Sequence, residues 1–261
     1  MLTKIRDAGF ENVMLDQEGT RNLRRFITVA HETGLKVPFV HLDSTSASSI
    51  WTTCESQKDF LKYIDDSIKI CGDGGVETVV MHPSYAATGC APSQIGVDCM
   101  EHLLRTASAH NVKIALENPG KEHLPHLAYL MNNIDSKNLG FCFDSGHWNL
   151  SPDVDLLELY GDRLIAVHLH DNLGVQSGLS RYWDQDMHQI PFDGSIDFDR
   201  IAQGIAKTNY NGPVMLESRR SEKNGSRYLG MPPKDFLENA QTKARRLAGM
   251  ISHYKSSARC F

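Results

Sequence analysis

The sequence predicts a single-domain α/β fold, a TIM-type (β/α)8 barrel over residues 1–261. Segments with apolar residues at helical spacing alternate with short apolar runs of strand length, the pattern of a parallel sheet covered by helices. A length of 261 residues also suits such a barrel, which typically takes about 250. The chain opens on a helix, whereas this barrel opens on a strand. We therefore expect either that the first strand is absent from this chain or that another segment closes the gap.

Helix–strand pairs follow one another through the first half of the chain. Apolar spacing marks each helix, and Gly9 and Gly34 mark the ends of the first two, since glycine commonly terminates helices. Each strand is a run rich in Val, Ile, Leu and Phe. The predicted pairs are 2–8 with 10–16, 22–33 with 37–41, 58–71 with 77–82, 100–109 with 112–117, and 124–132 with 139–144.

The second half continues the alternation. Ser151, Pro152 and Asp153 predict a helix start, because Ser caps helices and Pro is tolerated in the first turn. That helix is expected to end near residue 160, before a strand at 164–168. A long loop then leads to a helix at 198–206, a strand at 214–217 and a final helix at 234–253.

Bulk composition narrows the function classes. A net charge of −5 argues against nucleic acid as a partner, because such binders usually cluster Lys and Arg. No apolar run approaches the roughly 20 residues that span a bilayer, and the N-terminus does not resemble a signal peptide. We therefore expect no membrane partner and a cytoplasmic location. The scattered cysteines are expected to be reduced thiols: Cys54, Cys71, Cys90, Cys99, Cys142 and Cys260.

The last residue of each predicted strand carries the chemical signal. In a β/α barrel these carboxyl ends meet on one face, where active sites are built. A single His or Glu there is more often structural or solvated than functional. A set of six metal-binding or acid–base residues at one kind of position is hard to explain by coincidence, and Asp16 adds a seventh that is too generic to count. The six are His41, His82, Glu117, Asp144, His168 and Glu217.

Local clusters add donors to this set. Asp144 and His147 lie three residues apart at a predicted strand-to-helix turn, next to Trp148. In the long loop, Asp186 and His188 are placed to cover the mouth of a pocket. His123 and His126 lie on a predicted helix away from the strand ends, where we expect structural roles.

These motifs together resemble the xylose isomerase-like barrel superfamily. It includes the sugar phosphate isomerases and epimerases and, more remotely, the endonuclease IV enzymes that act on apurinic DNA. The resemblance runs from about residue 5 to residue 250. Its most specific pieces are Leu116-Glu-Asn-Pro119, Asp144-Ser-Gly-His147, His168-Leu-His-Asp-Asn172, Asp186-Met-His188, Pro191-Phe-Asp-Gly194 and Leu216-Glu217.

In the epimerase branch, the resemblance implies one divalent metal ion held by Glu117, Asp144, His168 and Glu217. Oxygen donors with one imidazole suit Mn²⁺, Mg²⁺ or Co²⁺ better than a closed zinc site, although Zn²⁺ is also compatible. Glu117 and Glu217 would also serve as catalytic acid and base. Substrate-binding roles fall on His41, His82, His147, Trp148, Asp186 and His188.

The implied function is isomerisation or epimerisation of a sugar or sugar-like polyol, by proton transfer through an enediolate. A metal-dependent dehydratase or lyase of the same superfamily is an alternative. So is a three-zinc nuclease, because the six strand-end residues, His147, Asp186 and His188 match its nine ligands in type. A non-catalytic sugar-binding barrel is the fourth possibility. An exposed sheet edge would favour a homodimer. The identity of the sugar stays open.

Overall fold

The structure of the protein is a computed structural model, which describes residues 1–17, 22–85, 89–178, 182–220 and 227–258. The chain divides into two compact units. Unit 1 comprises Met1–Phe10 and Phe143–Phe261, and unit 2 comprises Glu11–Cys142.

Unit 2 is built on a parallel sheet whose strands follow one another in chain order. Each neighbouring pair is parallel, as the alternation of helices and strands predicts. In the register, Asp16 lies opposite His41 and Glu117 lies opposite Cys142. The strands are β1 (Leu15–Gln17), β2 (Phe39–Leu42), β3 (Thr78–Met81), β4 (Lys113–Glu117) and β5 (Leu139–Asp144), the last of which ends in unit 1.

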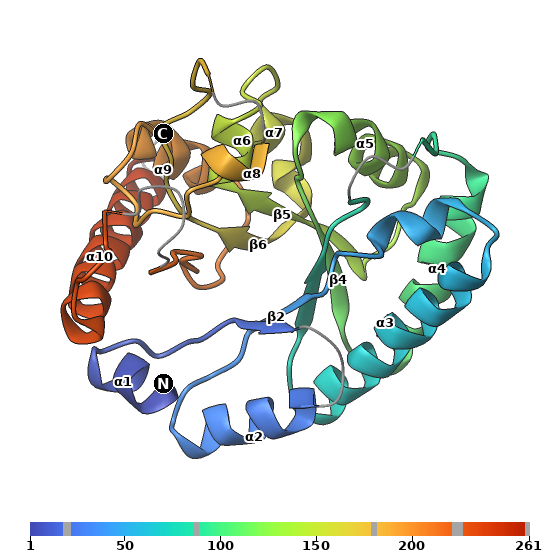
Figure 1. Ribbon diagram of the computed structural model, residues 1–261, viewed down its shortest axis with the longest axis horizontal. Coiled ribbons are helices and arrows are strands. Elements are labelled where there is room, and N and C mark those ends of the chain that lie inside the picture. The colour runs from blue at the N-terminus through green and yellow to red at the C-terminus, as the bar shows by residue number, and fades with distance from the viewer. Residues whose placement is uncertain (18–21, 86–88, 179–181, 221–226, 259–261) are drawn as a thin grey trace. The chain divides into compact units, whose positions relative to one another are not determined.

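Amphipathic helices connect these strands, and α3 and α4 run side by side along the sheet of unit 2 (Figure 1). In α2, Leu23, Ile27 and Ala30 are buried at the spacing that predicted the helix. Short 3₁₀ turns, η2 (Ala47–Trp51) and η3 (Lys121–His123), precede two of the helices. The helices are α2 (Leu23–Glu32), α3 (Glu55–Asp73), α4 (Gln94–Ala109) and α5 (Leu124–Asn133).

Trp51 fixes the segment that follows β3. Its side chain is buried, and its indole N–H donates to the carbonyl oxygen of Pro83 at 2.8 Å. The ring lies against α4 at Gly96, where a Cβ atom would come within 2.2 Å of a ring carbon. A glycine is therefore required in this helix, and the residue after His82 is held by a buried hydrogen bond.

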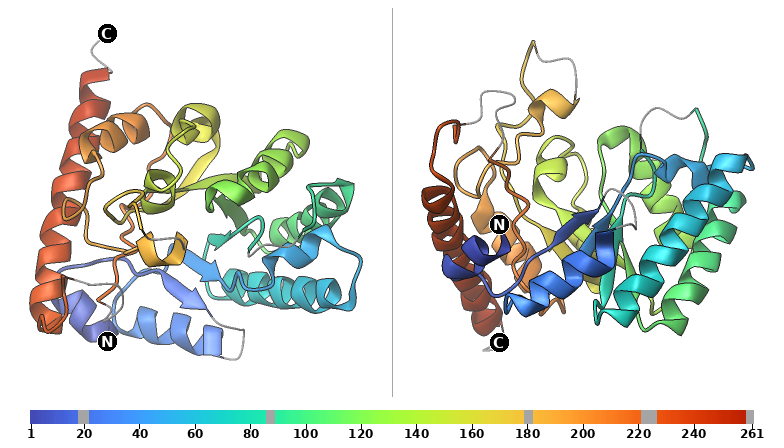
Figure 2. Two further views of the ribbon diagram at one scale, coloured as in Figure 1. Left: turned by 45° about the horizontal axis from the view of Figure 1, so that its top comes forward. Right: turned by 60° about the horizontal axis from the view of Figure 1, so that its bottom comes forward.

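Unit 1 contains the end of β5 and the strand β6 (Leu164–His168), together with its own helices. Figure 2 shows the long helix α10 beside α9, and α1 packs against α10 as well. The hydroxyl of Tyr254 on α10 donates to Asp199 on α9. The remaining elements of this unit are α1 (Leu2–Asp7), α6 (Ser145–Asn149), α7 (Leu156–Tyr160), η4 (Gly161–Arg163), α8 (Tyr182–Gln185), α9 (Phe198–Ala206) and α10 (Pro233–Ala258).

Some element boundaries differ from the prediction. The helix start at Ser151 is wrong, because Asp144 caps α6 directly after β5 and Asp155 caps α7, which begins at Leu156. The predicted strand 10–16 is reduced to a bridge at Asn12 and the short β1. The predicted strand 214–217 forms a single parallel bridge, between Leu216 and Leu169.

Among the described residues, the helices lack the combination of length and apolar character that membrane crossing demands. The cysteines within the described ranges are free thiols, and Cys260 lies outside those ranges.

Candidate functional site

The end of β5 turns directly into α6, and this turn positions two polar side chains of unit 1. Asp144 is the N-cap of α6, and its Oδ1 accepts the backbone N–H of His147 at 2.7 Å. The His147 ring then lies over the same turn, with Nδ1 at 3.7 Å from Asp144 Oδ1. Both side chains are buried. The sequence prediction that Asp144 and His147 lie together is therefore confirmed.

Beyond β6, the chain pairs with residues 215–217 and brings two further donors together. Leu169 donates its N–H to Met215 O at 2.9 Å, and Glu217 donates its N–H to Leu169 O at 3.2 Å. This parallel bridge places His168 beside Glu217, with 3.3 Å between His168 Nδ1 and Glu217 Oε2. The His168 side chain is fully buried, whereas that of Glu217 keeps a little exposure.

The long loop folds back through a second bridge, antiparallel this time. Asp171 and Gln189 exchange two backbone hydrogen bonds of 2.8 Å. His188 next to this bridge adopts a left-handed φ of 47°. Its Nδ1 lies 2.8 Å from the backbone oxygen of Glu217, and its Nε2 lies 3.0 Å from Asp186 Oδ2. Backbone pairing thus holds Asp186 and His188 beside Glu217, and their covering of a pocket mouth stays a prediction.

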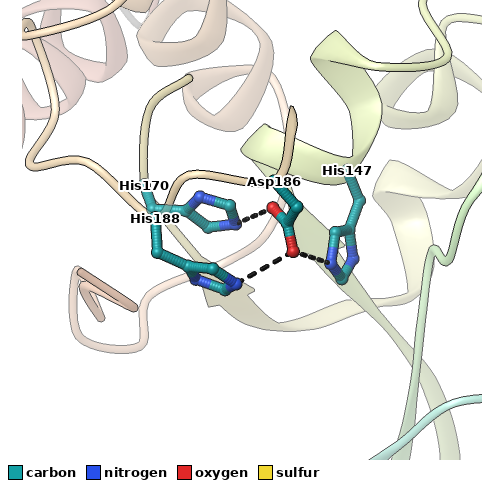
Figure 3. A group of neighbouring side chains, drawn as sticks. All are labelled: His147, His170, Asp186 and His188. Carbon is teal, nitrogen blue, oxygen red and sulfur yellow. Dashed lines mark hydrogen bonds and ion pairs between the residues drawn. The ribbon is translucent and has the colours of Figure 1, made fainter. Parts of the chain in front are cut away.

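Figure 3 shows the carboxylate of Asp186 among three imidazoles. Asp186 Oδ2 faces His188 Nε2 and also His147 Nε2, at 3.5 Å, and Oδ1 lies 3.9 Å from His170 Nε2. Burial opposes ionisation of Asp186, but the neighbouring His188 and His147 outweigh it and hold the pKa of this carboxyl well below its usual range. The Asp186 carboxylate therefore lies within 4 Å of a ring nitrogen of each of three histidines.

His170 lies in the motif His168-Leu-His-Asp-Asn172, but no role in the site was predicted for it. Its ring is fully buried, and Nε2 lies 3.1 Å from both carboxylate oxygens of Asp144. Burial lowers the pKa of the imidazole, but the carboxylates of Asp144, Asp186 and Glu217 together raise the pKa of His170 to about 9. The alternation of His168 and His170 was a visible signal, but it did not show which carboxylate each ring would meet.

Unit 2 carries its own histidine–carboxylate cluster at the ends of β2, β3 and β4. His41 Nε2 lies 3.1 Å from Glu117 Oε2, and His82 Nε2 lies 3.3 Å from Glu117 Oε1. The two rings meet edge to face, with centroids 5.3 Å apart. These three predicted site residues therefore lie together, as parallel neighbouring strands require.

His123 lies closer to this cluster of unit 2 than the sequence indicated. Its Nδ1 lies 2.9 Å from the hydroxyl of Ser84, two residues beyond His82. Burial lowers the pKa of His123. The expectation that His123 lies away from the strand ends is therefore wrong, because η3 follows β4 after only a short connection and carries the ring back to that edge.

Trp148 and Arg219 make contacts in unit 1 that the sequence did not indicate. Trp148, a predicted substrate contact, directs its indole N–H to Val154 O at 2.9 Å, and the guanidinium of Arg200 lies 5.0 Å from its ring centroid. The described contacts of the Trp148 indole are thus with Val154 and Arg200 of unit 1. Arg219, which no sequence motif singled out, reaches Glu217 Oε1 with Nη2 at 3.0 Å and is half-exposed.

The donors of unit 1 fit a divalent metal ion. Asp144, His168 and Glu217 each offer a ligand atom, and these atoms lie within 4.8 Å of one another. The His188 ring lies between two acceptors, with Nδ1 at the backbone oxygen of Glu217 and Nε2 at Asp186 Oδ2. A ring with a single N–H can donate to only one of them, so the other contact needs a second proton or a metal ion. His41 repeats this arrangement in unit 2, between Leu42 O and Glu117.

The comparisons with known proteins point to one family. The family model described as "Xylose isomerase-like TIM barrel" matches residues 2–245. The uncharacterized protein y4fM of Sinorhizobium fredii is 29% identical over 299 residues, covering 98% of this chain and 90% of that protein. An inosose dehydratase of Salmonella typhimurium is 28% identical over 177 residues, which cover 62% of this chain and 55% of that enzyme. The chain therefore matches only about half of the length of that enzyme.

A solved structure of an L-ribulose 3-epimerase superposes with a TM-score of 0.76 at 16% identity, covering 99% of this chain and 90% of that one. Such a likeness concerns the fold. Together with the family match, it confirms the predicted TIM-type α/β fold class. The chain belongs to the xylose isomerase-like TIM barrel family.

Proposed function

We propose that this protein is a divalent-metal-dependent isomerase or epimerase that acts on a sugar or a sugar-like polyol ketone by proton transfer. The observation that carries the proposal is the convergence of Asp144, His168 and Glu217 in unit 1, each with a ligand atom within 4.8 Å of the others. These residues come from the end of β5, the end of β6 and the segment that pairs beyond β6. Family membership supports the same chemistry, since the similar structures include an L-ribulose 3-epimerase.

Glu117 completes the proposed ligand set, as the resemblance to the epimerases implies. Three carboxylates and one imidazole, with positions left for substrate oxygens, favour Mn²⁺, Mg²⁺ or Co²⁺, and Zn²⁺ remains compatible. Such an ion would supply Lewis-acid stabilisation of the negative charge that develops on the substrate oxygens.

The chain's own residues would perform the proton transfers. Glu217 and Glu117 are the proposed base and acid, and two carboxylates from separate segments of the chain can serve opposite faces of a substrate carbon, as epimerisation requires. The side chains of His147, Asp186 and His188 are proposed to hold substrate hydroxyls, for which imidazole and carboxylate groups are good partners. Substrate contacts by His41, His82 and Trp148 are part of the same proposal.

Dehydration of a cyclitol ketone is the second candidate. It is favoured by the 28% identity with an inosose dehydratase, although the match covers only part of that enzyme. Both reactions begin with removal of a proton next to a carbonyl. Dehydration then needs an acid to protonate the departing hydroxyl, and the imidazoles around Asp186 offer candidates.

The first experiment combines metal analysis with an isotope screen. Protein purified without added metal or chelator is analysed for metal content, then incubated in D₂O with ketoses and with inososes. Deuterium uptake without loss of water supports the isomerase or epimerase. Loss of water with formation of an unsaturated product supports the dehydratase.

Other outcomes would sink the proposal. About three zinc ions per chain with cleavage of apurinic DNA would favour the nuclease, which uses metal-activated hydroxide. Binding of sugar without any exchange, with metal present, would favour a non-catalytic sugar-binding barrel.

Substitution Glu217→Gln tests the proposed base. It keeps the size of the side chain but removes its basicity, so deuterium uptake should fall by about 100-fold or more, the range for loss of a general acid or base. Glu158→Gln, on an exposed position of α7, is the matched control and should leave the rate unchanged. Equal rates for all three proteins would contradict the role of Glu217.

A further inference from the structure

The buried ring of His170 contacts no solvent, yet it makes close contacts with both oxygens of the Asp144 carboxylate. Its Nε2 lies 3.1 Å from Oδ1 and 3.1 Å from Oδ2. The backbone N–H of His147 donates to Oδ1 of the same carboxylate. Asp144 is thus held from two directions, by a main-chain group of α6 and by an imidazole from the segment beyond β6.

The surroundings of His170 are built to hold the ring. Ser145 Oγ accepts the backbone N–H of His170 at 3.0 Å and donates to its carbonyl oxygen at 2.7 Å. The ring fills the space next to Gly146, where a Cβ atom would lie 2.0 Å from its Cε1. On another side it stacks on His188, with centroids 4.0 Å apart and an interplanar angle of 16°. The position and the plane of the imidazole are therefore both determined.

We propose that His170 is a positioning residue, whose Nε2–H fixes the orientation of the Asp144 carboxylate for the bound metal ion. The inference rests on the proposed function, in which Asp144 is a metal ligand. A carboxylate that binds a metal commonly needs an outer hydrogen bond to hold its orientation, and removal of such a partner typically weakens metal binding about 10- to 100-fold. Complete burial of His170 separates this role from contact with substrate.

Direct ligation by His170 is the competing role. Its ring nitrogens, with those of His147 and His188 and an oxygen of Asp186, include ligand atoms within 4.8 Å of one another. The observed contacts favour positioning, because Nε2 is at equal distance from the two oxygens of Asp144 and farther from Asp186, at 3.9 Å. A nitrogen so placed donates its hydrogen to Asp144.

The test measures Mn²⁺ binding by titration calorimetry on the metal-free protein of residues 1–261, alongside its Tm. His170→Leu removes the donor, and His170→Asn keeps a polar side chain that is too short to reach. His170→Gln places an amide N–H near the position of Nε2. The control is His102→Leu, which removes a half-exposed histidine that bonds Asp65 at 2.7 Å in unit 2.

We expect the dissociation constant to rise about 10- to 100-fold in the Leu and Asn variants. The Gln variant should retain most of the affinity, the control should match the wild type, and the number of Mn²⁺ ions per chain should not change. If His170→Leu fails to fold, the comparison of the Asn and Gln variants carries the same test, since both side chains are amides.

Three outcomes would overturn the positioning role. An unchanged Mn²⁺ dissociation constant in both the Leu and Asn variants would show that the hydrogen bond from His170 does not orient Asp144 for metal binding. Loss of one ion per chain, with the remaining affinity unchanged, would make His170 a ligand. Equal losses of affinity and Tm in the Gln, Asn and Leu variants would make its role structural. Absence of Mn²⁺ binding by the wild type would instead overturn the proposed function, and the inference with it.

Discussion

The thiol of Cys54 is exposed at the N-cap of α3, between two hydroxyl groups. Its Sγ lies 2.8 Å from Ser56 Oγ and 2.8 Å from Thr52 Oγ1. The hydrogen bond from Ser56, followed by that from Thr52, stabilises the thiolate and lowers the pKa of Cys54 to about 7. The buried thiol of Cys71 shows the opposite effect, because burial raises its pKa to about 12.

Alkylation of Cys54 by iodoacetamide should therefore accelerate as the pH rises through about 7, where the thiolate forms. The rate is read by mass spectrometry of the peptide that contains Cys54. Ser56→Ala should move the midpoint upward toward the ordinary value of about 8.5, and Ser252→Ala on α10 should not. A midpoint near 8.5 in the wild-type protein would contradict the stabilising contacts.

At the scale of single residues, the sequence predicted the donors that end strands, because position at a strand end is visible in the apolar pattern. Asp144, His147, Asp186 and His188 do converge in unit 1, and His41, His82 and Glu117 converge in unit 2. His170 and Arg219 were missed because they lie in segments without regular secondary structure. There the spacing of residues does not fix the direction of a side chain. Metal binding and catalysis by the predicted residues stay predictions.

At the scale of elements, the loop that carries Asp186 and His188 is anchored by Asp171. The carboxylate of Asp171 accepts three backbone N–H groups, from Asn172 at 2.9 Å, Gly194 at 2.8 Å and Ile196 at 3.1 Å. A Cβ atom on Gly194 would lie 2.2 Å from the carbonyl oxygen of Asn172, so the close approach also requires glycine. One side chain thus closes the end of the loop.

Asp171→Ala should lower the free energy of unfolding by about 2–4 kcal/mol, because it leaves several backbone donors without their acceptor. Chemical denaturation followed by circular dichroism measures this change. Asp135→Ala, at an exposed position, is the control and should change the stability by less than about 0.5 kcal/mol. An equally small effect of Asp171→Ala would mean that water replaces the carboxylate.

The elements themselves were predicted unevenly. Long amphipathic helices such as α3 and buried strands such as β5 have strong periodic or apolar patterns, and both are present. The region after β5 was harder, because Asp144, Ser151 and Asp155 are all good helix caps, and only packing decides which of them is used. The segment 214–217 is apolar like a strand, yet only Leu216 makes a bridge, beside Leu169.

At the scale of the whole molecule, the sequence predicted the fold class because alternating helices and apolar strands leave few arrangements other than a parallel sheet covered by helices. The family match over residues 2–245 confirms it. The reaction and the metal could not be predicted to the same depth. Donor types limit the metal to a group of ions, and hydroxyl-binding side chains do not distinguish one polyol from another.

The burial of Trp51 and Trp148 has an optical consequence. The chain contains three tryptophans, and Trp51 lies in unit 2 whereas Trp148 lies in unit 1. Their side chains are 3% and 8% exposed, so each should emit at short wavelength when folded and shift to the red when unfolding admits water. With Trp183→Phe as background, Trp51→Phe and Trp148→Phe would each leave one fluorophore, reporting on one unit.

If residues 1–261 form one cooperative domain, the fluorescence transition of each single-tryptophan protein should have the same denaturant midpoint and slope as its own circular dichroism transition. Comparing the two signals on one sample removes any difference in stability between the two proteins. Two separated fluorescence transitions, each out of step with the circular dichroism curve, would instead show that the units melt independently. The fluorescence of Trp51 thus reports on the unfolding of unit 2, and that of Trp148 on the unfolding of unit 1.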